Sequence, residues 1–172
     1  MESTSTKRTS VICDQFTKEL EAEVRATREC LEQVPMDKAD WKPHEKSMPL
    51  GYLAILVADI PRWLQHMIEH GVVDFQTYEQ RHPKTADELV TLFDENMEAA
   101  RKALSTLLDD DLANEFQLKN GDELLWTSPL DESISSSINH MVHHRGQLTV
   151  YLRMNDGKVP SIYGPSADSP GF

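Results

Sequence analysis

Apolar residues recur along this chain every three, four or seven positions in four long stretches, and this spacing predicts four amphipathic helices. The stretches cover residues 10–34, 50–70 and 85–108, and a last one that begins between residues 129 and 133 and ends near 154. Pro35 and Gly71 follow the first two stretches, and Thr85 to Glu88 has the form of a capping box at the start of the third. Long helices joined by loops, without alternating strands, are typical of a helix bundle.

Two connections carry weaker signals. Residues 71–84 are mostly polar and predict a loop, whereas residues 116–126 flank the pair Asn120-Gly121 with apolar side chains, which predicts a β-hairpin. We therefore expect an all-α fold, a four-helix bundle with a small hairpin excursion between the third and fourth helices. No composition shift or repeat divides the chain, so residues 1–172 are expected to form a single domain with residues 1–9 as a flexible leader.

The charge balance restricts the partners. The chain has 17 basic and 29 acidic residues, a net charge of -12, which argues against binding to nucleic acid or to an anionic membrane surface. No apolar run approaches the ~20 residues of a membrane span, and the first residues lack the apolar core of a signal peptide. We therefore expect a cytoplasmic protein. Cys13 and Cys30 fall on one predicted helix about 25 Å apart, too far for a disulfide within one molecule.

The fourth helix carries the candidate chemistry. His140 and His144 are four residues apart and so lie on one face of the helix, beside its apolar stripe. Two such imidazoles can provide two ligands to one metal ion, but a site needs more. The alternative is a pair of surface histidines with no ligand. Arg145 falls close to the middle of the apolar stripe, where its charge would need a buried carboxylate or a cavity.

Three segments resemble a known family. They are HMVHHRGQLTVYLR at residues 140–153, VPSIYGPSAD at 159–168, and WKPHEKSM at 41–48 followed by LG at 50–51 and ADIP at 58–61. Together they resemble the DinB family, which includes YfiT-like metal-dependent hydrolases. The resemblance implies a four-helix bundle, often a homodimer, with a divalent metal (zinc or nickel) held by one His of the second helix and the two His of an HxxxH motif in the fourth. Characterised relatives are thiol-dependent S-transferases and isomerases.

One of the three implied metal ligands is missing. The HxxxH motif falls on His140 and His144, but the position of the second-helix ligand is occupied by Leu56, which cannot bind a metal. His44, just before the second helix, is a candidate replacement if it folds over the mouth of the bundle. Asp59, one turn beyond Leu56, is another.

Two functions remain open at this stage. The first is a metal-dependent enzyme of the thiol-dependent transferase or hydrolase class, acting on a small-molecule substrate or a low-molecular-weight thiol at the HxxxH motif. The second is a metal-depleted, non-enzymatic bundle that serves as a stress-related binding or interaction protein. The intact motif around His140 and His144 favours the first function, and Leu56 favours the second.

Overall fold

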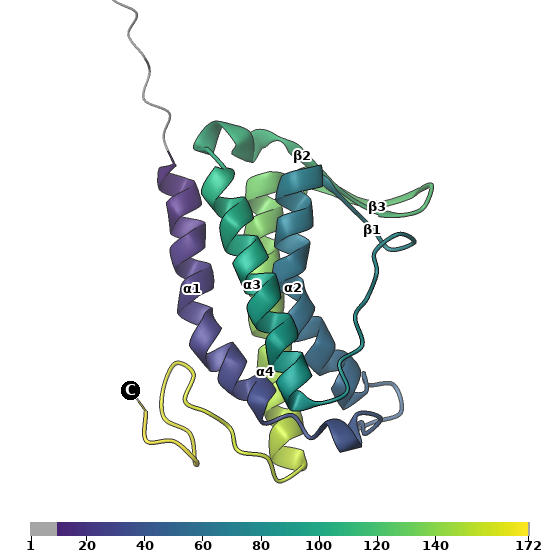
Figure 1. Cartoon of the computed structure of the whole chain (residues 1–172), viewed down its shortest axis with the longest axis vertical. Coiled ribbons are helices and arrows are strands. Elements are labelled where there is room, and N and C mark those ends of the chain that lie inside the picture. The colour runs from purple at the N-terminus through teal and green to yellow at the C-terminus, as the bar shows by residue number, and fades with distance from the viewer. Residues whose placement is uncertain (1–9, 172) are drawn as a thin grey trace, which may run out of the picture.

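A computed structural model describes residues 10–171, so the predicted leader at residues 1–9 lies outside the described part of the chain. Four long helices form the body of the molecule: α1 (Val11–Glu32), α2 (Leu50–His70), α3 (Ala86–Thr106) and α4 (Leu130–Met154) (Figure 1). Their ends lie within a few residues of the predicted ones. Two short 3₁₀ turns, η1 (Met36–Lys38) and η2 (Asp109–Ala113), follow α1 and α3.

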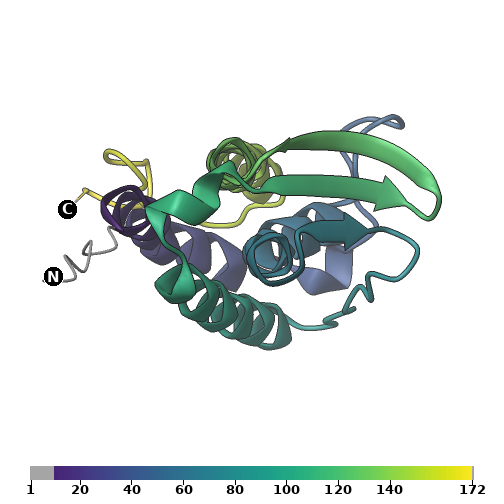
Figure 2. The ribbon, with the colours of Figure 1, turned by 90° about the horizontal axis from the view of Figure 1, so that it is seen from above.

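The helices occupy the four corners of a bundle, and α1 lies diagonally opposite α2. The helix α2 packs against α3 and α4, and α1 packs against the same two helices, whereas α1 and α2 touch little. Seen from above, this places α3 and α4 on the other diagonal (Figure 2). In Figure 1, α2 and α3 run in the same direction, so the chain after α2 must return along the length of the bundle before α3 begins. We call this segment, residues 75–85, the return connection.

Local chemistry explains where the helices begin and end. Gly71 ends α2 with φ of 66°, a left-handed conformation that favours glycine, and its N–H donates to the carbonyl of Met67. At the start of α3 the Thr85 hydroxyl accepts a hydrogen bond from the backbone N–H of Glu88 at 3.1 Å. Gly71 is therefore confirmed as the end of α2 and Thr85 as the cap of α3, but the Glu88 carboxylate accepts the N–H of Lys84 at 2.7 Å and not that of Thr85, so the predicted capping box is only half present.

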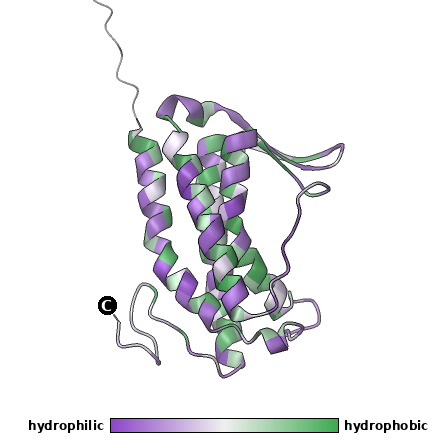
Figure 3. Cartoon of the chain, viewed as in Figure 1, coloured by the Kyte–Doolittle hydropathy of each residue, from purple (hydrophilic) through white to green (hydrophobic). Residues whose placement is uncertain are grey.

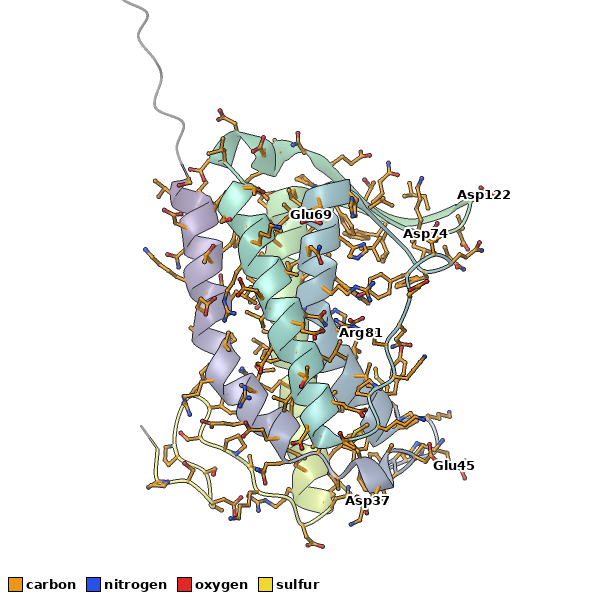
Figure 4. All side chains as sticks on the ribbon, in the orientation of Figure 1. Asp37, Glu45, Glu69, Asp74, Arg81 and Asp122 are labelled. Atoms are coloured by element: carbon orange, nitrogen blue, oxygen red, sulfur yellow. The ribbon has the colours of Figure 1, made fainter. Side chains whose placement is uncertain are left out.

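A small sheet corrects the all-α prediction. The predicted hairpin is present as β2 (Glu115–Asn120) and β3 (Glu123–Pro129), with Gly121 at φ of 64° in its turn. A third strand, β1 (Val72–Asp74), pairs in parallel with β2, where a polar loop was expected. The side chain of Asp74 accepts the N–H of Gly121 at 2.9 Å, which ties β1 to the hairpin turn. Figure 4 labels Asp74 and Asp122 at this end of the sheet.

Most of the buried interior of the bundle is apolar, and the described residues include a buried ion pair between Arg145 and Glu23. Figure 3 shows hydrophilic residues over much of the outward surface of α3, as expected for an amphipathic helix. Arg145 is only 1% exposed, and the carboxylate of Glu23 on α1 lies 2.6 Å from its guanidinium. The buried partner that the position of Arg145 requires is therefore Glu23. Among residues 10–171, no helix combines the length and the apolar character needed to cross a membrane.

Candidate functional site

The two histidines of α4 point their ring nitrogens at each other. The Nε2 atoms of His140 and His144 are 2.7 Å apart, and the ring centroids are 4.5 Å apart. The Nδ1 atom of His144 lies 2.7 Å from Oε1 of Gln147, one turn further along the helix. Because an amide oxygen only accepts, Nδ1 of His144 carries the proton, and in the neutral pair His140 Nε2–H then donates to Nε2 of His144. Residues of α4 alone thus supply the hydrogen-bond partners of both facing nitrogens.

The surroundings keep His140 uncharged. Burial is the main cause that lowers the pKa of His140 below its ordinary value of 6.5, and the neighbouring rings of His144 and His143 lower it further. His144 is 6% exposed, whereas His143 faces outward. The pair at neutral pH is therefore a hydrogen-bonding group with little positive charge at His140.

Both histidines line a pocket of about 340 Å³ between α2, α4 and the return connection. Leu56 of α2 also lines this pocket, so the two imidazoles face a common space with Leu56, as the helical spacing of the histidines and the family resemblance of the second helix together predict. The remaining lining residues come from three places. Met48 precedes α2, Tyr52, Asp59 and Trp63 lie on α2, and Phe75, Tyr78 and Gln80 lie on the return connection. We call this space the histidine pocket.

Aromatic rings form much of its wall around Trp63. The ring centroid of Trp63 lies 5.9 Å from that of Phe75 with planes inclined by 59°, and 6.2 Å from that of Tyr78 with planes inclined by 85°. His140 is also in ring contact with Trp63, at 5.9 Å. Inclined rings at these distances are favourable aromatic contacts, and the rings of Trp63, Phe75 and Tyr78 all line the pocket.

A buried carboxylate lies beside these rings. Asp59 is 3% exposed, and its Oδ2 accepts the hydroxyl of Tyr78 at 2.8 Å. Its Oδ1 accepts the amide of Asn96 on α3 at 3.3 Å. Burial, followed by the charge of Asp59, raises the pKa of Tyr78 well above its ordinary value of 10, so the Tyr78 hydroxyl stays protonated and donates.

A second pocket of about 420 Å³ adjoins the first, because Trp63 and His140 line both. It lies between the hairpin and the first half of α4 and is bordered by Trp126, Ser128 and Ser137 among others. Trp126 Nε1 donates to the Ser128 hydroxyl at 3.0 Å, and the hydroxyls of Ser128 and Ser133 are 2.7 Å apart. The hydroxyls of Ser128 and Ser133 therefore already have hydrogen-bond partners.

The other predicted site residues lie elsewhere. His44 does not line the histidine pocket; it is exposed, and its Nδ1 accepts the backbone N–H of Lys46 at 3.1 Å within its own loop. The expectation that His44 folds over the bundle mouth is corrected, because its ring nitrogen is satisfied locally. Arg145 takes no part in the pocket either, since Glu23, Thr27 and Tyr163 bind its guanidinium on the side of α1.

These residues do not fit a tightly held divalent metal. Within residues 10–171, no three side chains of His, Cys, Asp or Glu are grouped so that they could hold one ion. His140 and His144 give two nitrogens, Leu56 gives none, and the oxygens of Asp59 accept from Tyr78 and Asn96. A structural or catalytic metal in proteins ordinarily has at least three protein ligands.

The fold and the site define a four-helix-bundle protein with a paired-histidine pocket between its second and fourth helices. The family model of the DinB family matches residues 1–170, so the chain belongs to the DinB family. A DinB-like protein from Bacillus subtilis has the same fold, with a TM-score of 0.66, 21% identity, and coverage of 84% of this chain and 94% of that one.

A DinB-like protein from Bacillus cereus gives a TM-score of 0.67 at 22% identity, covering 87% of this chain and 97% of that one. At these identities the likeness concerns the fold alone. No curated protein matches the chain.

Sequence reasoning did not identify the aromatic wall. Trp63 lies seven residues after Leu56 and thus on the same face of α2, which is a signal that helical spacing alone could have given. Phe75 and Tyr78 come from a segment without periodicity, so only the tertiary structure brings them to the pocket.

Proposed function

We propose that this DinB-family protein binds a small organic molecule in the histidine pocket and does so without a tightly held resident metal. The observation that carries the proposal is Leu56, which lines the pocket together with His140 and His144 and occupies the position of the third implied ligand. An apolar side chain there removes a metal ligand and adds contact area for a carbon skeleton. This is the binding-protein alternative of the two functions that the sequence leaves open.

The shape and chemistry of the pocket support binding of a small molecule. Its volume of about 340 Å³ falls in the range of ligand pockets, and aromatic and aliphatic walls surround a few polar groups. The imidazole pair, Asp59 and Gln80 are the polar groups that would orient a ligand. Tyr52 is 48% exposed and Phe75 is 44% exposed, so both lie where a ligand would enter and become covered.

A metal-dependent S-transferase or hydrolase is the second candidate. It is favoured by the convergence of the His140 and His144 Nε2 atoms at 2.7 Å and by the contact of His144 with Gln147, which resembles the outer-shell support of metal-binding histidines. In that case His140 and His144 would hold a zinc or nickel ion, which would act as a Lewis acid toward a small substrate or thiol. A cytoplasmic location and a homodimer remain predictions under either function.

Metal content separates the two candidates. The protein is purified without an affinity tag, dialysed against a chelator, and titrated with Zn²⁺ and Ni²⁺ in a calorimeter, alongside Leu56→His. We expect the wild type to retain well under one equivalent and Leu56→His to bind more tightly, because it restores a third nitrogen. A wild type that keeps one full equivalent through dialysis would overturn the proposal in favour of the enzyme.

Ligand binding is tested separately by filling the histidine pocket with a larger side chain. Leu56→Trp places a larger side chain against the imidazole pair, while Leu125→Trp adds the same ring on the exposed strand β3, where Leu125 is 43% exposed, and serves as the control. Small aromatic probes should bind to the wild type and to Leu125→Trp but not to Leu56→Trp. Equal binding to all three proteins would place the probes outside the histidine pocket and contradict the proposal.

A further inference from the structure

We infer that the histidine pocket selects an organic ammonium ion, meaning an amine or alkylated ammonium carried on a small apolar body. The inference rests on the proposed function, since it names the class of ligand for the same pocket. Two features carry it: aromatic ring faces gathered around Trp63, and the buried carboxylate of Asp59 beside them. The two features attract the same kind of charge.

The aromatic wall is suited to a cation. The face of an aromatic ring carries a negative potential, and inclined rings can contact one ammonium group from several sides at once. Within this group the guanidinium of Arg62 already lies 4.7 Å from the ring centroid of Tyr78. Trp63, Phe75 and Tyr52 line the pocket as further rings that a ligand can contact.

Asp59 supplies the negative charge. Its carboxylate accepts hydrogen bonds from two neutral donors, the hydroxyl of Tyr78 and the amide of Asn96. A carboxylate has about four acceptor positions. In the described part of the chain no basic side chain lies within ion-pair distance of Asp59. A buried charge without a counter-ion is unfavourable, and a cationic ligand in the pocket would compensate for it.

The guanidinium groups of Arg62 and Arg81 bind acceptors other than Asp59. Arg62 donates to the carbonyl of Glu79 on the return connection at 2.7 Å. Arg81 pairs with Glu95 and donates to Asn96 at 2.6 Å, so it reaches Asp59 only through that amide. Figure 4 labels Arg81 on the return connection, which holds Tyr78 against α2.

The charges around the pocket would disfavour an anionic ligand. Among residues 10–171 no Lys or Arg lines the pocket, and Asp59 would repel a carboxylate or phosphate. His140 and His144 also line the pocket, and a neutral imidazole nitrogen can accept a hydrogen bond from an ammonium group. The net charge of -12 adds a long-range attraction for cations.

Three probes of similar size and different charge test the inference: phenethylammonium, phenethyl alcohol and phenylacetate. Calorimetry at neutral pH gives the affinity of each for the full-length protein. We expect phenethylammonium to bind about ten-fold or more tightly than the alcohol, and phenylacetate to bind most weakly. Equal affinities, or a preference for phenylacetate, would refute the ammonium inference while leaving the proposed binding function intact. Absence of binding by all three would contradict both.

Variants assign the selectivity to the residues named. Asp59→Asn should lower the affinity for phenethylammonium more than that for the alcohol and so remove the preference for the cation, whereas Glu69→Gln changes an exposed carboxylate of the same helix outside the pocket and should change neither affinity. If Asp59→Asn does not fold, the partly exposed rings provide the test. Phe75→Leu or Tyr52→Leu should lower the affinity for phenethylammonium more than that for the alcohol. Unchanged selectivity in these variants would refute the aromatic contribution.

Discussion

The guanidinium of Arg145 lies 2.6 Å from the carboxylate of Glu23, and this ion pair joins α4 to α1 in the interior of the bundle. Arg145 also donates to the hydroxyls of Thr27 at 3.0 Å and Tyr163 at 2.9 Å. Tyr163 in turn donates to Glu23 at 2.9 Å, so the C-terminal segment is held against the same pair. The arrangement is a structural clamp on the face of α4 that points away from the histidine pocket.

Removing the carboxylate from this clamp should be strongly destabilising. Glu23→Ala leaves the guanidinium buried without its counter-ion, and we expect a loss of about 3–5 kcal/mol in the free energy of unfolding. Urea denaturation measures it. Glu29→Ala on the same helix removes an exposed pair with Arg25 and should cost about 0.3–0.5 kcal/mol. Similar losses in the two variants would mean that the buried pair contributes no more than the exposed one.

The hydroxyl of Tyr163 should anchor the C-terminal segment. Tyr163→Phe removes one hydrogen bond to Arg145 and one to Glu23, so we expect a loss of about 1 kcal/mol and faster proteolytic cleavage within residues 155–171. Limited proteolysis followed by mass spectrometry detects the cleavage. An unchanged cleavage rate would show that the ring of Tyr163, rather than its hydroxyl, holds the segment.

Replacement by alanine should stabilise the protein at Gly146 and destabilise it at Gly51. A Cβ added at Gly146 in α4 meets nothing within 4 Å, so Gly146→Ala should stabilise the protein by about 0.4–1 kcal/mol through the entropy of the unfolded chain. At Gly51 in α2 the added Cβ would lie 2.7 Å from the Cβ of Ala39, and Gly51→Ala should cost about 1–3 kcal/mol. Thermal unfolding of both variants measures the two shifts. If the melting temperature changed in the same direction in both variants, the close packing of Ala39 against α2 would be contradicted.

The stability of the protein should decline in alkaline solution through Cys30. Burial raises the pKa of its thiol from 9.0 to about 12, and the charge of nearby Arg145 only partly opposes this. Below pH 9 the thiol is protonated in both the folded and the unfolded chain; above it only the unfolded chain ionises, so stability is lost as the pH rises from 9 toward 12. The free energy of unfolding should therefore fall more steeply over this range in the wild type than in Cys30→Ala.

Chemical labelling provides an independent check on Cys30. Iodoacetamide reacts with the thiolate, so the buried thiol should stay unmodified in the folded protein at pH 8 to 9 and react after unfolding in urea. Rapid labelling of Cys30 under native conditions would contradict its burial between the helices.

The helices could be read from the sequence because their signals are local. Apolar spacing marked the four helices, Gly71 and Thr85 marked ends, and the pair Asn120-Gly121 marked the hairpin. Each signal depends on residues within one or two turns of each other, where backbone preference and side-chain direction decide the outcome. The same arithmetic placed His140 and His144 on one face of α4, and the family resemblance placed Leu56 opposite them; all three line one pocket.

Strand β1 and the position of His44 could not be read in this way. The strand exists because Val72 to Asp74 pair in parallel with Gln117 to Lys119, a contact between segments far apart in the chain. His44 was a candidate ligand because it lies just before α2, but its Nδ1 accepts a backbone N–H of its own loop. The partner of β1 is distant in the chain, whereas the partner of His44 is a backbone N–H two residues away, which the pattern of side chains does not reveal.

The sequence by itself determined that this chain forms four amphipathic helices with a histidine pair on the last one, and that Arg145 requires a buried partner. Only the tertiary structure decided that the partner is Glu23, 122 positions away, and that Asp59, Trp63, Phe75 and Tyr78 meet around one pocket. The physical reason is that helix formation is governed by contacts within a few residues, whereas a buried charge or a pocket is formed by whichever distant side chains the packing of the helices brings within reach.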